Sequence, residues 1–163
     1  MADTFIQASF AFARSHAEMA LLEEAFLAAD NLAADMEPDP PSPEFLDIFP
    51  PSGGDAWRGF RTLFADPHFP DFGAQIEGAN TLTDPGCCQA TIFGMTNFDP
   101  NAVARLIQLC CRESLRQAPV GFEYCWTCSK PRVGELGGGW CVVHPDRVES
   151  GTTGEALAAA LTN

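Results

Sequence analysis

The fold is decided by residues 87–128, which read CCQATIFGMTNFDPNAVARLIQLCCRESLRQAPVGFEYCWTC. β-Branched and aromatic residues predict strands over 87–96 and 121–128. Between them, Asp99-Pro100 predicts a helix start, with Asp at the N-cap and Pro at the first helical position. We expect this helix to run to about Gln117. Its apolar face consists of Val103, Leu106, Ile107, Cys110 and Cys111.

The flanking sequence extends this pattern into a sheet. Residues 72–78 predict a further strand, joined to 87–96 through a turn at Asp84-Pro85-Gly86. Residues 139–144 predict the second arm of a hairpin with 121–128, an arm that Val148 extends past Pro145, and residues 154–161 predict a last helix capped by Thr152 or Thr153. The order strand-strand-helix-strand-strand-helix predicts an α+β fold, an antiparallel sheet with helices on one face.

The N-terminal third predicts an acidic helical segment that precedes this sheet. Alternating apolar residues over 4–13 indicate a strand, and Ser15 with Glu18 forms a capping box. The helix then runs to about Asp35, and one continuous helix from Asp3 is the alternative. Its predicted buried stripe consists of Met19, Leu22, Phe26, Ala29 and Ala33.

A proline-rich stretch, residues 37–54, follows the acidic segment and holds six of the 13 prolines. It contains apolar residues that we expect to dock on the main body as one helical turn, namely Phe45, Leu46, Ile48 and Phe49. A short helix over 55–65 should follow, with Asp55 as its N-cap and Trp57, Phe60 and Phe64 facing inward. With 163 residues, the chain predicts one domain, made of segments 1–36 and 37–54 and the body 55–163.

Charge is distributed unevenly along the chain. Residues 1–55 hold eleven carboxylates against the single cation Arg14, a net charge of −10 out of −13 for the whole chain. A field of one sign attracts basic surfaces and repels nucleic acid and anionic membranes. We therefore expect a protein partner with a basic surface, no direct nucleic acid and no membrane. The predicted contacting charges are Glu18, Glu23, Glu24, Asp30 and Asp35. An acidic surface that only maintains solubility is the alternative.

The predicted hairpin also carries a cysteine pattern. Cys125-x2-Cys128 is followed, after twelve residues, by Cys141-x2-His144, the ligand types and number of a structural zinc site. Residues i and i+3 of a strand point to opposite faces, which favours buried small residues over zinc. The pairs Cys87-Cys88 and Cys110-Cys111 are interpreted as buried thiols, with redox sensing as the alternative. A zinc- or thiol-dependent module is thus a second functional hypothesis, and zinc is the one cofactor considered.

Other function classes find less support in the sequence. His16 and His68 lack a nucleophile in a recognisable setting, no G-x-S-x-G motif or P-loop is present, and an enzyme of unrecognised type is the third hypothesis. Lys130-Pro131-Arg132 is the one concentrated positive segment, and Glu135 nearby indicates a solvated turn. No positive N-terminal region and no apolar run of about 18 residues is found, so we expect a cytoplasmic protein.

The segment from Gly121 to Arg132, together with Gly137-Gly138-Gly139, resembles a segment of short, uncharacterised proteobacterial proteins that often belong to mobile elements. The resemblance covers about residues 92–163, and Cys125 and Cys141 do not belong to its pattern. It implies no activity. It favours a counter-defence or host-takeover role for an acidic protein-binding protein, such as an anti-CRISPR-like inhibitor that engages the nucleic-acid-binding surface of its partner.

Overall fold

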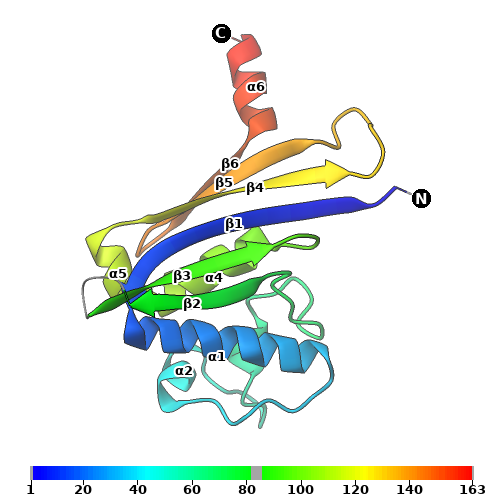
Figure 1. The fold of residues 1–163 in the computed structure, drawn as a ribbon. Helices are drawn as coiled ribbons and strands as arrows, with labels where there is room; N and C mark the ends of the chain where they lie inside the picture. The colour runs from blue at the N-terminus through cyan, green and yellow to red at the C-terminus, as the bar shows by residue number, and fades with distance from the viewer. Residues whose placement is uncertain (1, 82–85, 163) are drawn as a thin grey trace.

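The computed structural model describes residues 2–81 and 86–162, and a six-stranded antiparallel sheet forms its centre (Figure 1). The strands lie in the order β2-β3-β1-β4-β5-β6. They are β1 Thr4–Ser15, β2 Gln75–Thr81, β3 Cys87–Gly94, β4 Val120–Cys128, β5 Gly137–Val143 and β6 Val148–Thr152. The helices are α1 His16–Ala33, α2 Pro43–Ile48, α3 Arg58–Arg61, α4 Pro100–Cys110, α5 Arg112–Gln117 and α6 Thr153–Thr162.

The predicted α+β class is confirmed, and the chain order explains the sheet. The units β1-α1-β2 and β3-α4-β4 interleave, so that β3 lies between β1 and β2, and β1 lies between β3 and β4. This is the split β-α-β arrangement. Sequence analysis placed the first strand in a segment outside the sheet. The structure instead places β1 at the centre, so the N-terminal segment is part of the sheet layer.

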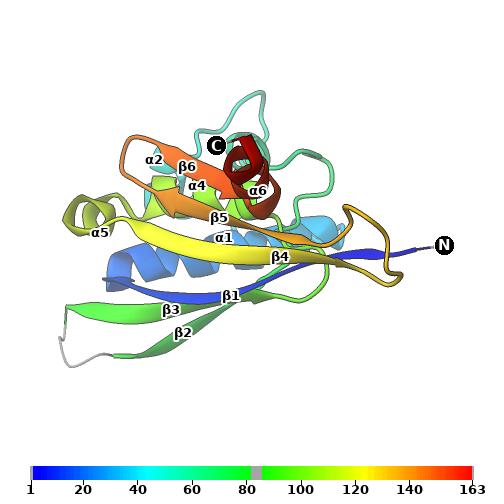
Figure 2. The same ribbon diagram turned by 90° about the horizontal axis from the view of Figure 1, so that it is seen from above.

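Helices cover one face of the sheet, and Figure 2 shows α1, α2 and α4 on that side. Side chains of β3 alternate between buried and half-buried, with Cys88, Ala90 and Ile92 facing the helices. Side chains that point to the other side of the sheet stay accessible to solvent, including those of Ser9, Glu123 and Trp140. We call this uncovered side the open sheet face.

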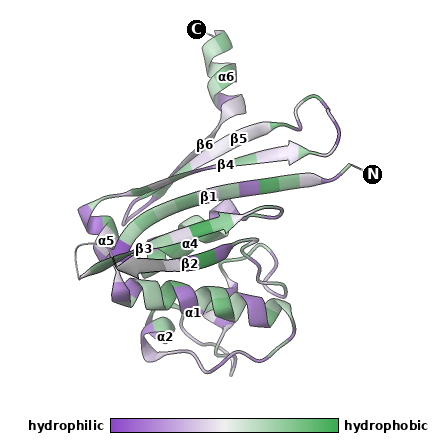
Figure 3. Ribbon diagram, viewed as in Figure 1, coloured by the Kyte–Doolittle hydropathy of each residue, from purple (hydrophilic) through white to green (hydrophobic). Residues whose placement is uncertain are grey.

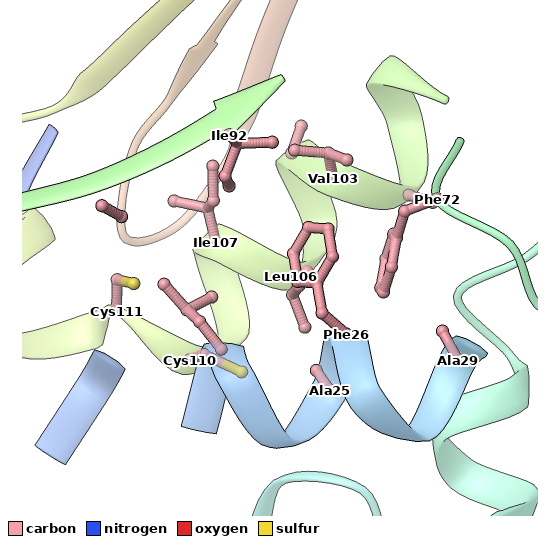
Figure 4. Close-up of a cluster of buried hydrophobic side chains, with 14 of the residues drawn as sticks. Ala25, Phe26, Ala29, Phe72, Ile92, Val103, Leu106, Ile107, Cys110 and Cys111 are labelled. Atoms are coloured by element: carbon pink, nitrogen blue, oxygen red, sulfur yellow. The ribbon is translucent and has the colours of Figure 1, made fainter. Parts of the chain in front are cut away.

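The core fills the space between the sheet and the two long helices (Figure 4). Phe26 of α1 and Leu106 of α4 approach each other, and Ile92 of β3 closes the cluster from the sheet side. The predicted stripe on α1 is buried except for Ala33, which is half-buried. The alternation of period 2 on β1 and of period 3.6 on α1 therefore gave the correct buried faces.

The predicted capping box starts α1. Ser15 Oγ accepts from the Glu18 backbone amide at 3.2 Å, and Glu18 Oε2 accepts from the Ser15 amide at 3.0 Å. The Glu18 carboxylate also reaches α5, 95 residues further along the chain, where Oε1 accepts from the backbone amides of Glu113 and Ser114, each at 3.0 Å. The Ser114 hydroxyl donates to Oε2. One buried carboxylate thus joins the starts of two helices.

This contact accounts for an error in the predicted helix over 100–117. The chain leaves helical geometry at Cys111, with φ −108° and ψ 36°, and α5 begins as a separate helix. In a continuous helix the amides of Glu113 and Ser114 would donate to carbonyls four residues earlier. Here they donate to Glu18 instead, which stabilises the break.

The proline-rich stretch docks on the body, as expected, through one short helix, α2. Phe45 and Phe49 are buried, and their rings pack with Phe60 at centroid distances of 5.4 Å. The predicted helix over 55–65 is shorter than expected and consists of α3 alone. Asp55 does not act as its N-cap, because its carboxylate accepts from the Trp57 amide within a turn before the helix.

Two strands differ from their predicted bounds. β2 starts at Gln75, because Gly73 before it adopts φ 59° in a turn where a Cβ atom would lie 1.9 Å from the Asn97 carbonyl oxygen. Val148 does not extend β5; it opens a separate strand after a turn in which the His144 amide donates to the Arg147 carbonyl at 2.9 Å. Asp84 and Pro85 of the predicted turn lie outside the described residues.

The last helix, α6, begins as predicted, with Thr152 Oγ1 accepting from the Glu155 amide at 3.2 Å. It projects from the end of β6 (Figure 1) and buries none of its residues. Figure 3 colours this helix as largely hydrophobic, and Leu157 and Leu161 are 61% and 78% exposed.

Replacing Glu18 with Gln should lower the free energy of unfolding by about 2–4 kcal/mol, because the Gln amide nitrogen cannot accept and leaves buried donors unsatisfied. Urea unfolding measures the change. Glu23→Gln, an exposed position on the same helix, is the matched control and should stay within about 0.5 kcal/mol of the parent chain. Equal unfolding midpoints for the two variants would contradict the role given to Glu18.

Candidate functional site

The five acidic residues predicted to contact a partner lie in three different settings. Glu23, Asp30 and Asp35 are exposed on or just after α1. Glu24 is half-buried, and Glu18 is only 5% exposed. The predicted acidic face therefore keeps three of its five residues at the surface.

Glu18 is corrected first. Both of its carboxylate oxygens accept hydrogen bonds within the protein, from Ser15, Glu113 and Ser114. It lies one helical turn before Leu22, on the buried side of α1, and cannot meet a partner in this structure. Its role is to join α1 to α5.

Glu24 holds the proline-rich stretch against α1. Its two carboxylate oxygens accept from the backbone amide and the hydroxyl of Ser42, each at 2.7 Å. Ser42 in turn caps α2, because its Oγ accepts from the Phe45 amide at 3.2 Å. Glu24 thereby positions the loop that flanks the exposed acids.

A groove of about 330 Å³ runs between α1 and this loop. Leu27 is 57% exposed in it, and Pro38, Pro40 and Trp57 contribute further apolar lining. Asp39 lines the same groove and is exposed. The groove therefore combines apolar lining with one exposed carboxylate, that of Asp39.

We define the α1 acidic surface as Glu23, Asp30, Asp35, Asp39 and Asp71, all of which are exposed. Partial burial, and next the negative charge of Asp71, raise the pKa of Asp30 above its usual value. Among the described residues, the ion pairs are Arg61–Asp55, Arg132–Glu135, His144–Glu149, Arg147–Asp146 and Arg147–Glu149. None of these ion pairs involves the α1 acidic surface, although Glu23 acts through space on the buried Arg14 and raises its pKa.

Sequence analysis missed two members of this surface. Asp39 lies in the proline-rich stretch, which was expected to dock on the body through its apolar residues, and no local pattern indicated that Glu24 and Ser42 hold its start against α1. Asp71 follows α1 by almost forty residues, and a turn in which its carboxylate accepts from the Gly73 amide at 2.7 Å holds it in place. No local pattern reveals that this turn lies near Asp30.

The predicted zinc ligands are spread over both faces of the hairpin. Cys125 is exposed on the open sheet face, whereas the side chain of Cys128, three residues later on the same strand, faces the opposite side of the sheet. Cys141 is 2% exposed and pairs with Phe122, and His144 Nε2 lies 3.4 Å from Glu149. Over residues 2–81 and 86–162, no group of three or more His, Cys, Asp or Glu side chains is arranged to hold a metal ion.

The two vicinal cysteine pairs contribute mainly to the core. Cys88, Cys110 and Cys111 are buried and Cys87 is half-buried, all with free thiols. Burial raises the pKa of Cys110 to about 12 and raises that of Cys111 as well. A thiol with a raised pKa carries little thiolate near neutral pH, which disfavours the redox-sensing interpretation for this pair.

Comparison of the chain with known protein families, with curated proteins and with solved structures finds no match. In the part of the chain that the structure describes, no helix combines the length and the apolar character needed to cross a membrane.

Asp30→Asn should raise the urea midpoint at about pH 7 and have no such effect at about pH 3, below the ordinary Asp value near 4. The pKa of Asp30 is raised on folding, so the folded chain binds the proton more tightly and loses stability as the pH rises through this window. The neutral amide removes that loss. Asp39→Asn is the control, and an equal gain in both variants would show that only overall charge matters.

Protein purified without chelator should contain less than about half an equivalent of zinc, because the i and i+3 ligands point to opposite faces of a strand. Elemental analysis provides the measurement. Stoichiometric zinc that is lost on Cys128→Ser would mean that the hairpin rearranges to bind metal, and would favour the zinc-module hypothesis.

Proposed function

We propose that this chain is a protein-binding protein whose α1 acidic surface engages a basic surface of another protein. The observation that carries the proposal is a set of exposed carboxylates that form no ion pair within the described part of the chain, together with an apolar groove that Asp39 lines. Partial burial is the main cause of the raised pKa of Asp30, and the nearby negative charge of Asp71 raises it further. A basic partner would supply the missing positive charge.

The groove adds apolar contact area to the charged surface. Charged rims mainly accelerate encounter and select partners, whereas buried apolar contacts at the centre supply most of the affinity. Leu27 and Asp39 line the groove together, and Asp30 follows Leu27 by three residues on α1. The groove has room for one or two side chains of a partner. We expect Leu27 to be the affinity anchor and the carboxylates to control the association rate.

The class of partner follows from the charge. Basic protein surfaces commonly bind nucleic acid, and an acidic surface that covers one competes with phosphate groups for the same cations. An inhibitor of a nucleic-acid-binding protein is therefore the form of this function that we favour, including the anti-CRISPR-like role that the resemblance suggested.

The test uses a partner captured by affinity purification from the source cells. The triple variant Glu23→Gln/Asp30→Asn/Asp35→Asn should slow association at least about tenfold at low salt and change dissociation much less, as rim charges do. The difference should shrink above physiological salt, where charges are screened beyond about 8 Å. Stopped-flow or surface-plasmon-resonance kinetics measure both rates. Glu24 is left intact because it anchors the loop.

A matched control removes the same charge elsewhere. Glu77→Gln/Glu113→Gln/Asp146→Asn neutralises three exposed carboxylates outside the α1 acidic surface. This variant should change the association rate by less than about threefold, because only the overall field is reduced. Equal association rates for the two triple variants would show that the acidity serves solubility alone.

A further inference from the structure

The open sheet face carries a row of facing residues that sequence analysis did not connect. Phe93 of β3 pairs with Ser9 of β1, and Glu123 of β4 pairs with Trp140 of β5, which in turn pairs with Gly151 of β6. Neighbours in such a row have side chains on the same face of the sheet. Ser9, Glu123 and Trp140 line a common concavity of about 570 Å³ on this face.

Trp140 is held in place by the glycine opposite it. A Cβ atom at Gly151 would lie 2.8–2.9 Å from indole atoms Cζ2, Cε2 and Nε1, so the ring packs directly on the Gly151 backbone. Any larger residue would displace the ring. Trp140 nevertheless remains 42% exposed, which leaves indole surface available to the concavity.

Two of the residues that line the concavity, Glu123 and Gln7, have a side-chain acceptor without a hydrogen-bond partner among the described residues. Within the described part of the chain, the Glu123 carboxylate takes part in no hydrogen bond or ion pair. The Gln7 side-chain nitrogen donates to the Met95 carbonyl at 3.0 Å. The side-chain oxygen of Gln7 therefore remains as a hydrogen-bond acceptor. Among the residues that the structure describes, no Lys, Arg or His lines the concavity.

The geometry points to a binding site for a cationic side chain, an arginine of a partner protein, between Trp140 and Glu123. An exposed indole attracts a cation placed over its face, and a carboxylate accepts two parallel N–H groups of a guanidinium. Arginine fits better than lysine because its planar group both stacks and forms the bidentate contact. The site lies on the open sheet face, away from α1, and its existence does not depend on the α1 acidic surface.

The experiment titrates the full-length protein with the peptide acetyl-Gly-Ser-Arg-Ser-Gly-amide and follows the indole N–H resonances by NMR. Three tryptophans give three such signals, and Trp140→Phe identifies the one from Trp140. The peptide should shift the Trp140 signal, and Glu123→Gln should weaken binding about fivefold or more, as expected when a charge-assisted hydrogen bond is lost. The lysine peptide should bind more weakly than the arginine peptide.

Two controls separate this site from the general acidity of the chain. The peptide with citrulline in place of arginine keeps the shape without the charge and should leave the Trp140 signal unchanged. Glu149→Gln removes a nearby carboxylate that Arg147 already pairs at 2.8 Å, and should leave binding unchanged. Equal losses for Glu123→Gln and Glu149→Gln, an equal shift with citrulline, or no shift of Trp140 would each overturn the proposal.

Discussion

The Glu18 carboxylate is the contact on which the rest of the structure depends. It closes the capping box that turns the chain from β1 into α1, and it accepts from the first amides of α5, so it joins the N-terminal segment to the region before β4. A buried carboxylate is costly unless hydrogen bonds compensate for lost hydration. Glu18 meets that condition with donors from two helix starts, where anions are favoured. β1 can therefore lie between β3 and β4 although 71 residues separate it from β3 and 104 from β4 along the chain.

Arg14, four residues before Glu18, is the buried cation of the same junction. Its guanidinium donates to the Phe12 carbonyl and the Met19 sulfur, and burial lowers its pKa despite the opposing effects of Cys88 and Glu18. Arg14 forms no ion pair with a carboxylate among the described residues, and Glu23 and Glu18 act on its charge through space. Neither buried group could move without losing its hydrogen-bond partners. The two charges therefore fix the conformation of the turn from β1 to α1.

Sequence reasoning succeeded where structure is encoded locally. Ser15 with Glu18 marked the start of α1, Asp99-Pro100 marked that of α4, and the hairpin followed from its strand residues and glycines. Sequence reasoning failed where a residue far away in the sequence determines the local structure or the strand order. The break at Cys111 depends on a carboxylate from α1, and the central position of β1 depends on pairing with two strands far away in sequence. The same limit applied to the acids: a charge count cannot tell that Glu18 and Glu24 are engaged internally, nor that Asp71 approaches Asp30.

The distribution of cations explains why neither proposed surface forms an ion pair among the described residues. Arg14 is buried, and Arg61, Arg132 and Arg147 already pair with nearby carboxylates. The remaining cations, Arg58, Arg105, Arg112, Arg116 and Lys130, all follow the acidic segment in sequence, and none lines the α1 groove or the concavity at Trp140. Pairing elsewhere thus leaves the α1 acidic surface and the Glu123 carboxylate, on opposite sides of one sheet, without an ion pair among the described residues. A single rigid basic patch could not contact both at once, because the sheet and its helices lie between them. A partner that used both would have to present two separate cationic segments, whereas a partner that used one would leave the other free.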